Sequence, residues 1–328
     1  MRSDNKIKSG VSMFSIGFSL TRSITVNRPV SEVMAIVGDF NQWNAWSPWI
    51  IQEPSCPVTV TGEPSKENHK QHWDGERIGS GQMILTEVIA DKQLSYDLEF
   101  FKPWKSKSKT QFTFEAITTE SGEEATKVNW LMQGSLPFFL FFMKKMMIAF
   151  ISFDYDRGLN MLQEYIETGS VQSSVEIQGI KKQKGFHYVG FRHKCNIEDI
   201  KQVMGPCFQQ LIDEKVPLPD MMVTISHKFD FVTGECELTG AFAYFNKPSF
   251  DVPTNMVFGE IPEHDGLQVD HTGSYNYLSN GWATAKGYQQ YAKLKSLKGV
   301  ADYEVYRNSP KSVAEEELLT SIILPVKS

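Results

Sequence analysis

The most hydrophobic passage of the chain, SLPFFLFFMKKMMIAFISF at Ser135–Phe153, sets the first limit on the fold. Its apolar part, Phe138–Phe153, has 16 residues and would span roughly 24 Å as a helix, short of the roughly 30 Å hydrocarbon core of a bilayer. Lys144 and Lys145 lie near its middle, where a charge costs several kcal/mol in lipid. We therefore expect no stable membrane insertion and a helix that packs within a globular fold.

The two sides of this helix differ in character. Projected at about 100° per residue, one broad arc is apolar, and we expect it to cover a ligand cavity with flexible side chains, among them Phe142 and Met146. Phe141 and Ile148 lie on the opposite side with the two lysines, which a plain core helix would not require. Transient docking of this side on a membrane or lipid is the alternative. The apolar arc contains Phe139, Phe142, Met143, Met146, Met147, Phe150 and Phe153.

The composition argues against several classes of protein. A chain of 328 residues exceeds one average core, so two domains are expected. A net charge of −6 argues against direct nucleic-acid binding. The four cysteines form no CxxC pair, so we expect no disulfide framework and no metal site, and no cofactor motif is present. A cytoplasmic location fits this cysteine usage, and no small-residue cleavage site follows the mildly apolar start.

The first half of the chain has mostly strand and turn signals. A strand pattern over residues 19–29 precedes a helix pattern over residues 29–40 and three tryptophans around a proline. We expect these tryptophans to pack at the mouth of a sheet, and Trp43 and Trp46 are also candidate ligand contacts. Further strands are expected at hairpin spacing, before a long helical stretch at 138–166. The strand-like runs are residues 81–90, 93–101, 109–117 and 126–136.

A small polar stretch divides the chain. ETGSVQSSVE is polar and contains glycine and serine, so residues 169–175 are expected to link a domain at 12–168 to a domain at 176–328. After the linker, a pattern of strands around one helix occurs twice, with the helices expected at 197–214 and 275–295. Two such units predict a pseudo-symmetric α+β domain with a groove between its halves.

Several motifs of the first segment combine in one order. ITVNRPVSEVMAIVGDFNQWNAWSPW at Ile24–Trp49 is followed by WDGERIGSGQMIL, by FKPWKSKSKTQFTF and by a long closing helix that contains DRGLNML. In this order they resemble the START-like superfamily, also called SRPBCC or polyketide cyclase-like. The resemblance implies a helix-grip fold, in which a curved antiparallel sheet wraps a long C-terminal helix around an apolar cavity for lipids, polyketides or other small ligands. Fold alone does not define a reaction here.

The second segment carries HTGSYNYLSNGW at His271–Trp282, YEVYRNSP at Tyr303–Pro310 and LLTSIILPV at Leu318–Val326. These motifs resemble the GyrI-like effector-binding domain, which also occurs in AraC-type and MerR-type transcription regulators. The resemblance implies that Glu304 lies at the bottom of an aromatic groove and attracts lipophilic cations, with walls from Tyr275, Trp282 and Tyr306. Ser274 departs from the family, which usually has a proline at that position.

Periodicity provides independent support for part of this site. On a strand, Asp302, Glu304 and Tyr306 share one face. Tyr275 and Trp282 are seven residues apart on the expected helix and therefore also share a face, although core packing would explain both equally well. A partly buried carboxylate among aromatic rings attracts an organic cation by charge and by cation–π contact.

Together these features favour a protein that binds a small amphipathic molecule, as a sensor or by sequestration, without a DNA-binding domain of its own. The alternative is a hydrolase of reactive electrophiles, in which Glu304 is the general acid or base and Glu235, Glu237 or Glu260 a second acid. No nucleophile motif is present, so the sequence leaves enzymatic activity open. A protein partner, such as the topoisomerase suggested by the family's namesake, is a third possibility.

Overall fold

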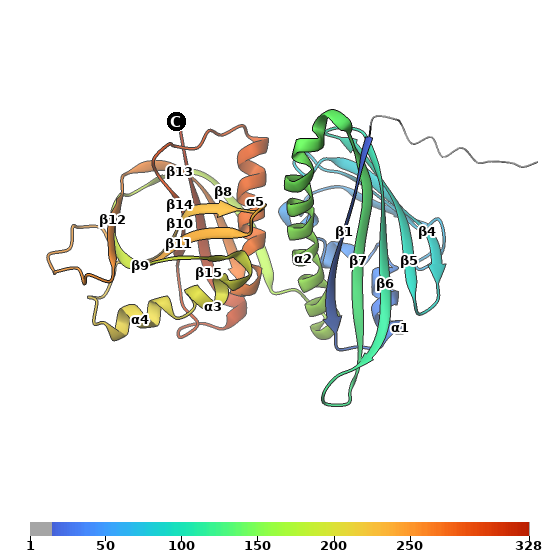
Figure 1. The fold of residues 1–328 in the computed structure, drawn as a ribbon, viewed down its shortest axis with the longest axis horizontal. Helices are drawn as coiled ribbons and strands as arrows, with labels where there is room; N and C mark the ends of the chain where they lie inside the picture. Colours follow the sequence, from blue (N-terminus) through green and yellow to red (C-terminus); the bar gives the residue numbers. More distant parts are fainter. Residues whose placement is uncertain (1–14, 328) are drawn as a thin grey trace, which may run out of the picture. The chain divides into compact units, whose positions relative to one another are not determined.

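The computed structural model describes residues 15–327, which fold into two compact units (Figure 1). The first is built on a seven-stranded antiparallel sheet and the second on an eight-stranded antiparallel sheet, which confirms the predicted α+β class. None of the helices within these residues combines the length and the apolarity needed to cross a membrane. Residues 12–14 and 328, at the outer ends of the two expected domains, lie outside the described residues.

The first sheet has the strand order β1-β7-β6-β5-β4-β3-β2. The four runs expected between residues 81 and 136 are strands β4 to β7, and two short strands, β2 and β3, precede them without having been predicted. After the sheet, a 3-10 helix and a long helix replace the single helix expected at 138–166. The elements are β1 (Ser15–Val26), α1 (Val30–Val37), η1 (Trp43–Ala45), η2 (Ile50–Gln52), β2 (Val58–Thr61), β3 (Lys70–Asp74), β4 (Ser80–Ile89), β5 (Gln93–Lys102), β6 (Ser106–Thr118), β7 (Glu124–Pro137), η3 (Phe138–Met143) and α2 (Lys144–Thr168).

A column of aromatic rings packs between the first sheet and α2. Successive residues of a strand point to opposite faces, so β7 turns Trp130 inward, where it is 1% exposed. Its ring stacks on that of Phe112 of β6, with centroids 4.7 Å apart, and on that of Tyr155 of α2, with centroids 3.8 Å apart. Trp130 Nε1 donates a hydrogen bond to Thr110 Oγ1, which also lies 3.1 Å from the Tyr155 hydroxyl. The polar atoms of the column are thus paired within it, as buried polar groups require.

The second unit repeats a strand–strand–helix–strand–strand order twice. β8, β9, α3 with α4, β10 and β11 form the first half, and β12, β13, α5, β14 and β15 form the second half. The elements are β8 (Ser173–Gln183), β9 (Phe186–Asn196), η4 (Ile197–Asp199), α3 (Ile200–Met204), α4 (Cys207–Asp213), β10 (Met221–Asp230), β11 (Glu235–Tyr244), β12 (Val257–Ile261), β13 (His264–Gly273), η5 (Tyr275–Tyr277), α5 (Leu278–Tyr291), β14 (Asp302–Tyr306), η6 (Glu315–Glu317) and β15 (Leu319–Val326).

Strands β8 and β12, one in each half, were not predicted. β8 begins at Ser173, within the stretch that was expected to be a linker, and it lies at the edge of the sheet. Its pairing with β13 is interrupted by a bulge at Gly179, whose φ of +81° suits a residue without a side chain. An edge strand with a bulge and exposed lysines lacks a clean apolar alternation, which explains the missed assignment.

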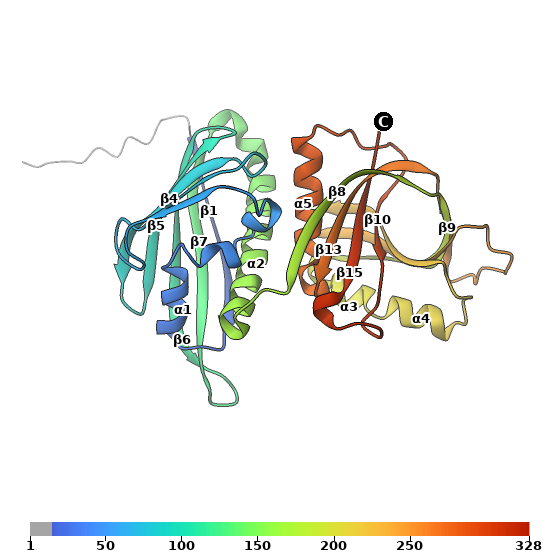
Figure 2. The same ribbon diagram turned by 180° about the vertical axis from the view of Figure 1, so that it is seen from behind.

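The order β12-β9-β11-β10-β14-β15-β13-β8 curls the second sheet (Figure 2). β8 and β9 are consecutive in the chain but lie near opposite ends of this order. Their connection closes the curl, because Gln183 pairs with His264 and Phe186 pairs with Ile261. One face of the sheet encloses an apolar core around Tyr303. That core also contains Phe186, Val223, Ile225, Ala241, Ala243, Ile261, Val305 and Ile323.

Helices cover both ends of the other face and leave its centre between them. Met204 of α3 and Cys207 and Leu211 of α4 pack on β9 and β11, and Ala285 of α5 packs on β13 and β15. β14 lies in the middle of the sheet, between β10 and β15. The groove predicted between the two halves would lie over the strip of β14 and β10 that separates α4 from α5, and it stays a prediction.

Candidate ligand-binding site

Glu304 lies at the centre of this strip. Alternation along β14 turns Tyr303 and Val305 into the enclosed core and turns Glu304 to the face that carries the helices. The side chain is buried, and its carboxylate accepts hydrogen bonds from Trp282 Nε1 of α5 and from the Tyr306 hydroxyl, the latter at 2.7 Å. Three of the four residues expected in the groove are therefore joined by hydrogen bonds.

Aromatic rings surround the Tyr306 side chain. Tyr275, in the 3-10 helix before α5, meets it edge to face with ring centroids 5.5 Å apart, and Phe208 of α4 does so at 5.3 Å. Thr224 of β10 lies directly opposite Glu304 in the strand register, with its hydroxyl 2.9 Å from that of Tyr306. Because the Tyr306 proton is donated to Glu304, Thr224 is the donor of this second bond. Tyr275 is 36% exposed and forms the solvent side of the cluster.

Phe208 and Thr224 were not predicted. Thr224 is identified by the register of β10 against β14, and Phe208 by the packing of α4, both of which are long-range contacts. The single helix expected at 197–214 divides near Gly205 into α3 and α4. Tyr275 precedes the α-helix instead of belonging to it, yet it lies in the same site as Trp282. The predicted sharing of a helix face was therefore wrong in detail.

The site places a carboxylate where burial opposes its charge. Burial raises the pKa of Glu304 above its usual value, although the hydrogen bonds from Trp282 and Tyr306 act in the opposite direction. Burial and the nearby Glu304 charge likewise raise the pKa values of Tyr306 and Tyr275, so both hydroxyl groups stay protonated at neutral pH. Within residues 15–327, no lysine, arginine or histidine lies within 4.0 Å of the Glu304 carboxylate. Its charge is therefore balanced only by neutral donors.

The corner at Ser274 keeps the geometry that a proline would impose. Its φ is −56° and its ψ is 139°, values that proline also adopts. The Ser274 hydroxyl accepts a hydrogen bond from the backbone of Asn276 and donates one to Glu315 at 2.5 Å. These bonds hold the turn that presents Tyr275, and the Ser274 N–H donates to the Gln172 carbonyl at 3.2 Å, a bond that a proline could not make.

The ligand contacts expected in the first segment occupy different environments. Trp43 and Trp46 are buried, with ring centroids 4.5 Å apart. Phe142 of η3 and Met146 of α2 are exposed. A common ligand role for these four residues stays a prediction.

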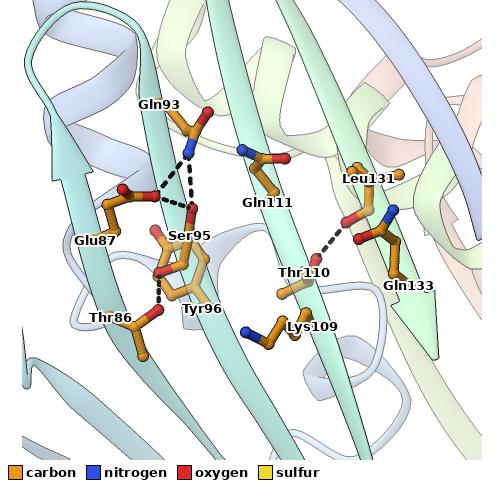
Figure 3. Close-up of a pocket in the computed structure, with 10 residues that line it drawn as sticks. All are labelled: Thr86, Glu87, Gln93, Ser95, Tyr96, Lys109, Thr110, Gln111, Leu131 and Gln133. Atoms are coloured by element: carbon orange, nitrogen blue, oxygen red, sulfur yellow. Dashed lines mark hydrogen bonds between the residues drawn. The ribbon is translucent and has the colours of Figure 1, made fainter. Parts of the chain in front are cut away.

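A hollow of about 220 Å³ lies on the outer side of strands β4 to β7 (Figure 3). Its lining is polar, and Gln93 connects Glu87 and Ser95 through hydrogen bonds of 2.9 Å to each. Gln111 and Gln133 extend the polar lining across β6 and β7. This hollow differs in character from the apolar cavity expected inside the sheet.

A family model described as "GyrI-like small molecule binding domain" matches residues 179–327. A second model, described as "Polyketide cyclase / dehydrase and lipid transport", matches residues 17–167. The chain thus joins a START-like, polyketide cyclase-type domain to a GyrI-like domain, which confirms both resemblances. No curated protein matches the chain.

Solved structures show similarity at low identity. The EcmrR–DNA complex, solved by cryo-electron microscopy, is 15% identical over 56% of this chain and 68% of its own, with a TM-score of 0.38. SAV2435 bound to tetraphenylphosphonium is 12% identical over 47% of this chain and 94% of its own, with a TM-score of 0.37. CalU16 from Micromonospora echinospora is 14% identical over 46% of this chain and 77% of its own, with a TM-score of 0.32. At TM-scores below 0.5, these similarities carry no argument about function.

Proposed function

We propose that the GyrI-like domain binds a lipophilic organic cation, with Glu304 as the counter-charge and Tyr275, Trp282, Tyr306 and Phe208 as the aromatic surroundings. One observation carries this proposal: a buried carboxylate accepts hydrogen bonds only from neutral groups and has no cationic partner among the described residues. A buried charge is stabilised by an opposite charge placed beside it. An aromatic organic cation supplies that charge and also stacks on the rings.

The protein would then act as a sensor or a sequestering agent for such compounds. The START-like domain would bind or shield an apolar molecule, as the family description of its segment suggests.

Two probes of the same shape and opposite charge test the proposal. Tetraphenylphosphonium is a lipophilic cation, and tetraphenylborate carries the same four rings around a negative charge. In calorimetry at neutral pH we expect the cation to bind with a micromolar dissociation constant and the anion to bind at least about tenfold more weakly, since a buried carboxylate repels it. Equal affinity for both probes would show that apolar contact alone drives binding, which contradicts the proposal.

A hydrolase is the second candidate, because the raised pKa of Glu304 also suits a general acid or base. The acids considered as its partner have other roles: Glu237 pairs with Arg192 at 2.8 Å and Glu235 with Lys228 at 3.1 Å. Glu260 lies on the edge strand β12. Turnover of a panel of strained electrophiles that is lost in Glu304→Ala would favour the enzyme over the binder.

A further inference from the structure

Five large aromatic side chains gather at one end of the first sheet with little cover. We refer to Trp104, Phe138, Phe139, Phe141 and Phe142 as the aromatic edge. Each is more than half exposed, with values between 57% and 72%. The rings of Phe138 and Phe141 stack with their centroids 5.9 Å apart, and Phe142 meets Phe141 edge to face with centroids 6.0 Å apart. These rings therefore contact one another while they remain exposed to solvent.

The strand register places the two parts of this surface together. η3 follows β7 directly after Pro137, at the end of the sheet where β1 begins at Ser15 (Figure 1). β6 pairs with β7 from Ser108 opposite Gly134, and β5 pairs with β6 up to Phe100 opposite Ser106. The turn that carries Trp104 therefore extends beyond the last paired residues at this same end.

Positive charge accompanies the aromatic edge, although the whole protein has a net charge of −6. Lys105 follows Trp104 in the turn, and Lys144 and Lys145 follow η3 at the start of α2. Residues 100–109 and 134–153 contain no aspartate or glutamate. Within residues 15–327, no carboxylate lies within 4.0 Å of these three lysines, whereas Lys107, in the strand β6 that follows the turn, pairs with Glu99 at 3.3 Å.

We propose that the aromatic edge and its three lysines form a docking surface for the face of an anionic phospholipid bilayer. Aromatic side chains are favoured at the boundary between headgroups and acyl chains, and lysines beside them reach anionic headgroups while their stems cover apolar surface. Each unpaired lysine near such a surface adds to binding in a manner that salt weakens. The protein docks without crossing the bilayer.

A second copy of the chain is a poorer occupant of this surface. A two-fold interface places the same patch on both partners, so the three unpaired lysines of one copy would face those of the other. Like charges brought together without a partner disfavour association. An anionic lipid surface instead supplies the missing negative charge to every lysine at once.

Vesicle co-sedimentation of the full chain tests the proposal. We expect binding to vesicles of phosphatidylcholine with about one third phosphatidylserine, weak binding to phosphatidylcholine alone, and loss of binding at high salt. Lys144→Glu/Lys145→Glu should reduce the partition coefficient on anionic vesicles roughly tenfold or more. Phe139→Ser/Phe142→Ser should do the same, because two exposed rings no longer enter the interface.

Matched controls separate docking from general effects. Lys295→Glu/Lys298→Glu makes the same change in net charge at exposed positions of the second unit, and Phe229→Ser/Phe258→Ser removes two exposed rings there. Both control variants should bind vesicles like the wild type. Equal losses in control and test variants, or no binding to anionic vesicles at all, would overturn the proposal. So would a wild-type dimer in light scattering that Phe139→Ser/Phe142→Ser converts to a monomer, since it assigns the surface to a second copy.

Discussion

Glu304→Gln is expected to weaken the binding of tetraphenylphosphonium by roughly ten- to a hundredfold in calorimetry. Glutamine has nearly the same shape as glutamate: its side-chain oxygen in the place of Oε1 accepts the hydrogen bond from Trp282, and its amide nitrogen in the place of Oε2 donates to the Tyr306 hydroxyl. The substitution therefore removes the charge with little change in packing. Because the site is buried and the carboxylate has no cationic partner among the described residues, this charge acts on a bound cation with little screening.

Asp302→Asn is the matched control. Asp302 lies two residues before Glu304 on β14, but its carboxylate is paired with Lys286 at 2.5 Å. Its removal changes the net charge by the same amount as Glu304→Gln, and we expect affinity within about threefold of the wild type. If both variants lose affinity equally, the general field of the protein attracts the cation, and Glu304 is not its specific partner.

The same carboxyl group predicts how binding depends on pH. Burial raises the pKa of Glu304, so its proton returns at a higher pH than for an exposed glutamate. As the pH falls through this raised pKa, the group becomes neutral and the affinity for the cation should decrease. In Glu304→Gln, the affinity for the cation should no longer change with pH around this pKa, and only the weak residual affinity should remain.

Stability of the ligand-free protein should change in the opposite sense. The folded-state pKa of Glu304 lies above the unfolded value, so the folded state binds more protons between the two, and stability falls as the pH rises through that window. At neutral pH the ionised, buried carboxylate therefore destabilises the fold. Glu304→Gln should raise the midpoint of thermal unfolding of the second unit while it lowers affinity, which is the signature of a group retained for binding.

The sequence was sufficient for the parts of this site that depend on local order. Alternation along β14 places Glu304 and Tyr306 on one face, and the hydrogen bond between them is consistent with that placement. Thr224 and Phe208 reach Tyr306 only because of the register of β10 and the packing of α4, and each lies about 80 to 100 positions from Tyr306 in the chain. Such pairings depend on the whole sheet, so no local pattern could identify them.

In the first segment, too, local sequence patterns predict only part of the structure. Its helix-grip architecture was implied by the resemblance of its motifs to the START-like superfamily, and the family match confirms it. The apolar arc of the long helix was expected to line a cavity, but four of its side chains are exposed: Phe139 and Phe142 of the separate 3-10 helix η3, and Met146 and Phe150 of α2. A helical projection assumes one continuous helix, and it fails where the backbone changes its period.

Trp130→Ala is expected to lower the free energy of unfolding of the first unit by about 3–5 kcal/mol. The indole is 1% exposed, lies between Phe112 and Tyr155, and donates to Thr110, so its removal leaves a cavity that these rings do not readily fill. Hydrogen exchange in increasing urea, followed on peptides of β6 and β7, measures this unit separately from the other. Trp104→Ala is the control, since that indole is 69% exposed and should cost at most about 0.5 kcal/mol.

The size of the difference between the two tryptophan variants also distinguishes two views of the START-like interior. A tightly packed core loses the transfer energy of the side chain and also pays for the cavity, whereas a pliable ligand cavity collapses around the gap and loses much less. A cost for Trp130→Ala close to that of Trp104→Ala would contradict the packed aromatic column. A cost near the upper end of the range would place any apolar ligand of this domain away from Trp130, because a ligand could enter there only by displacing rings that already stabilise the fold.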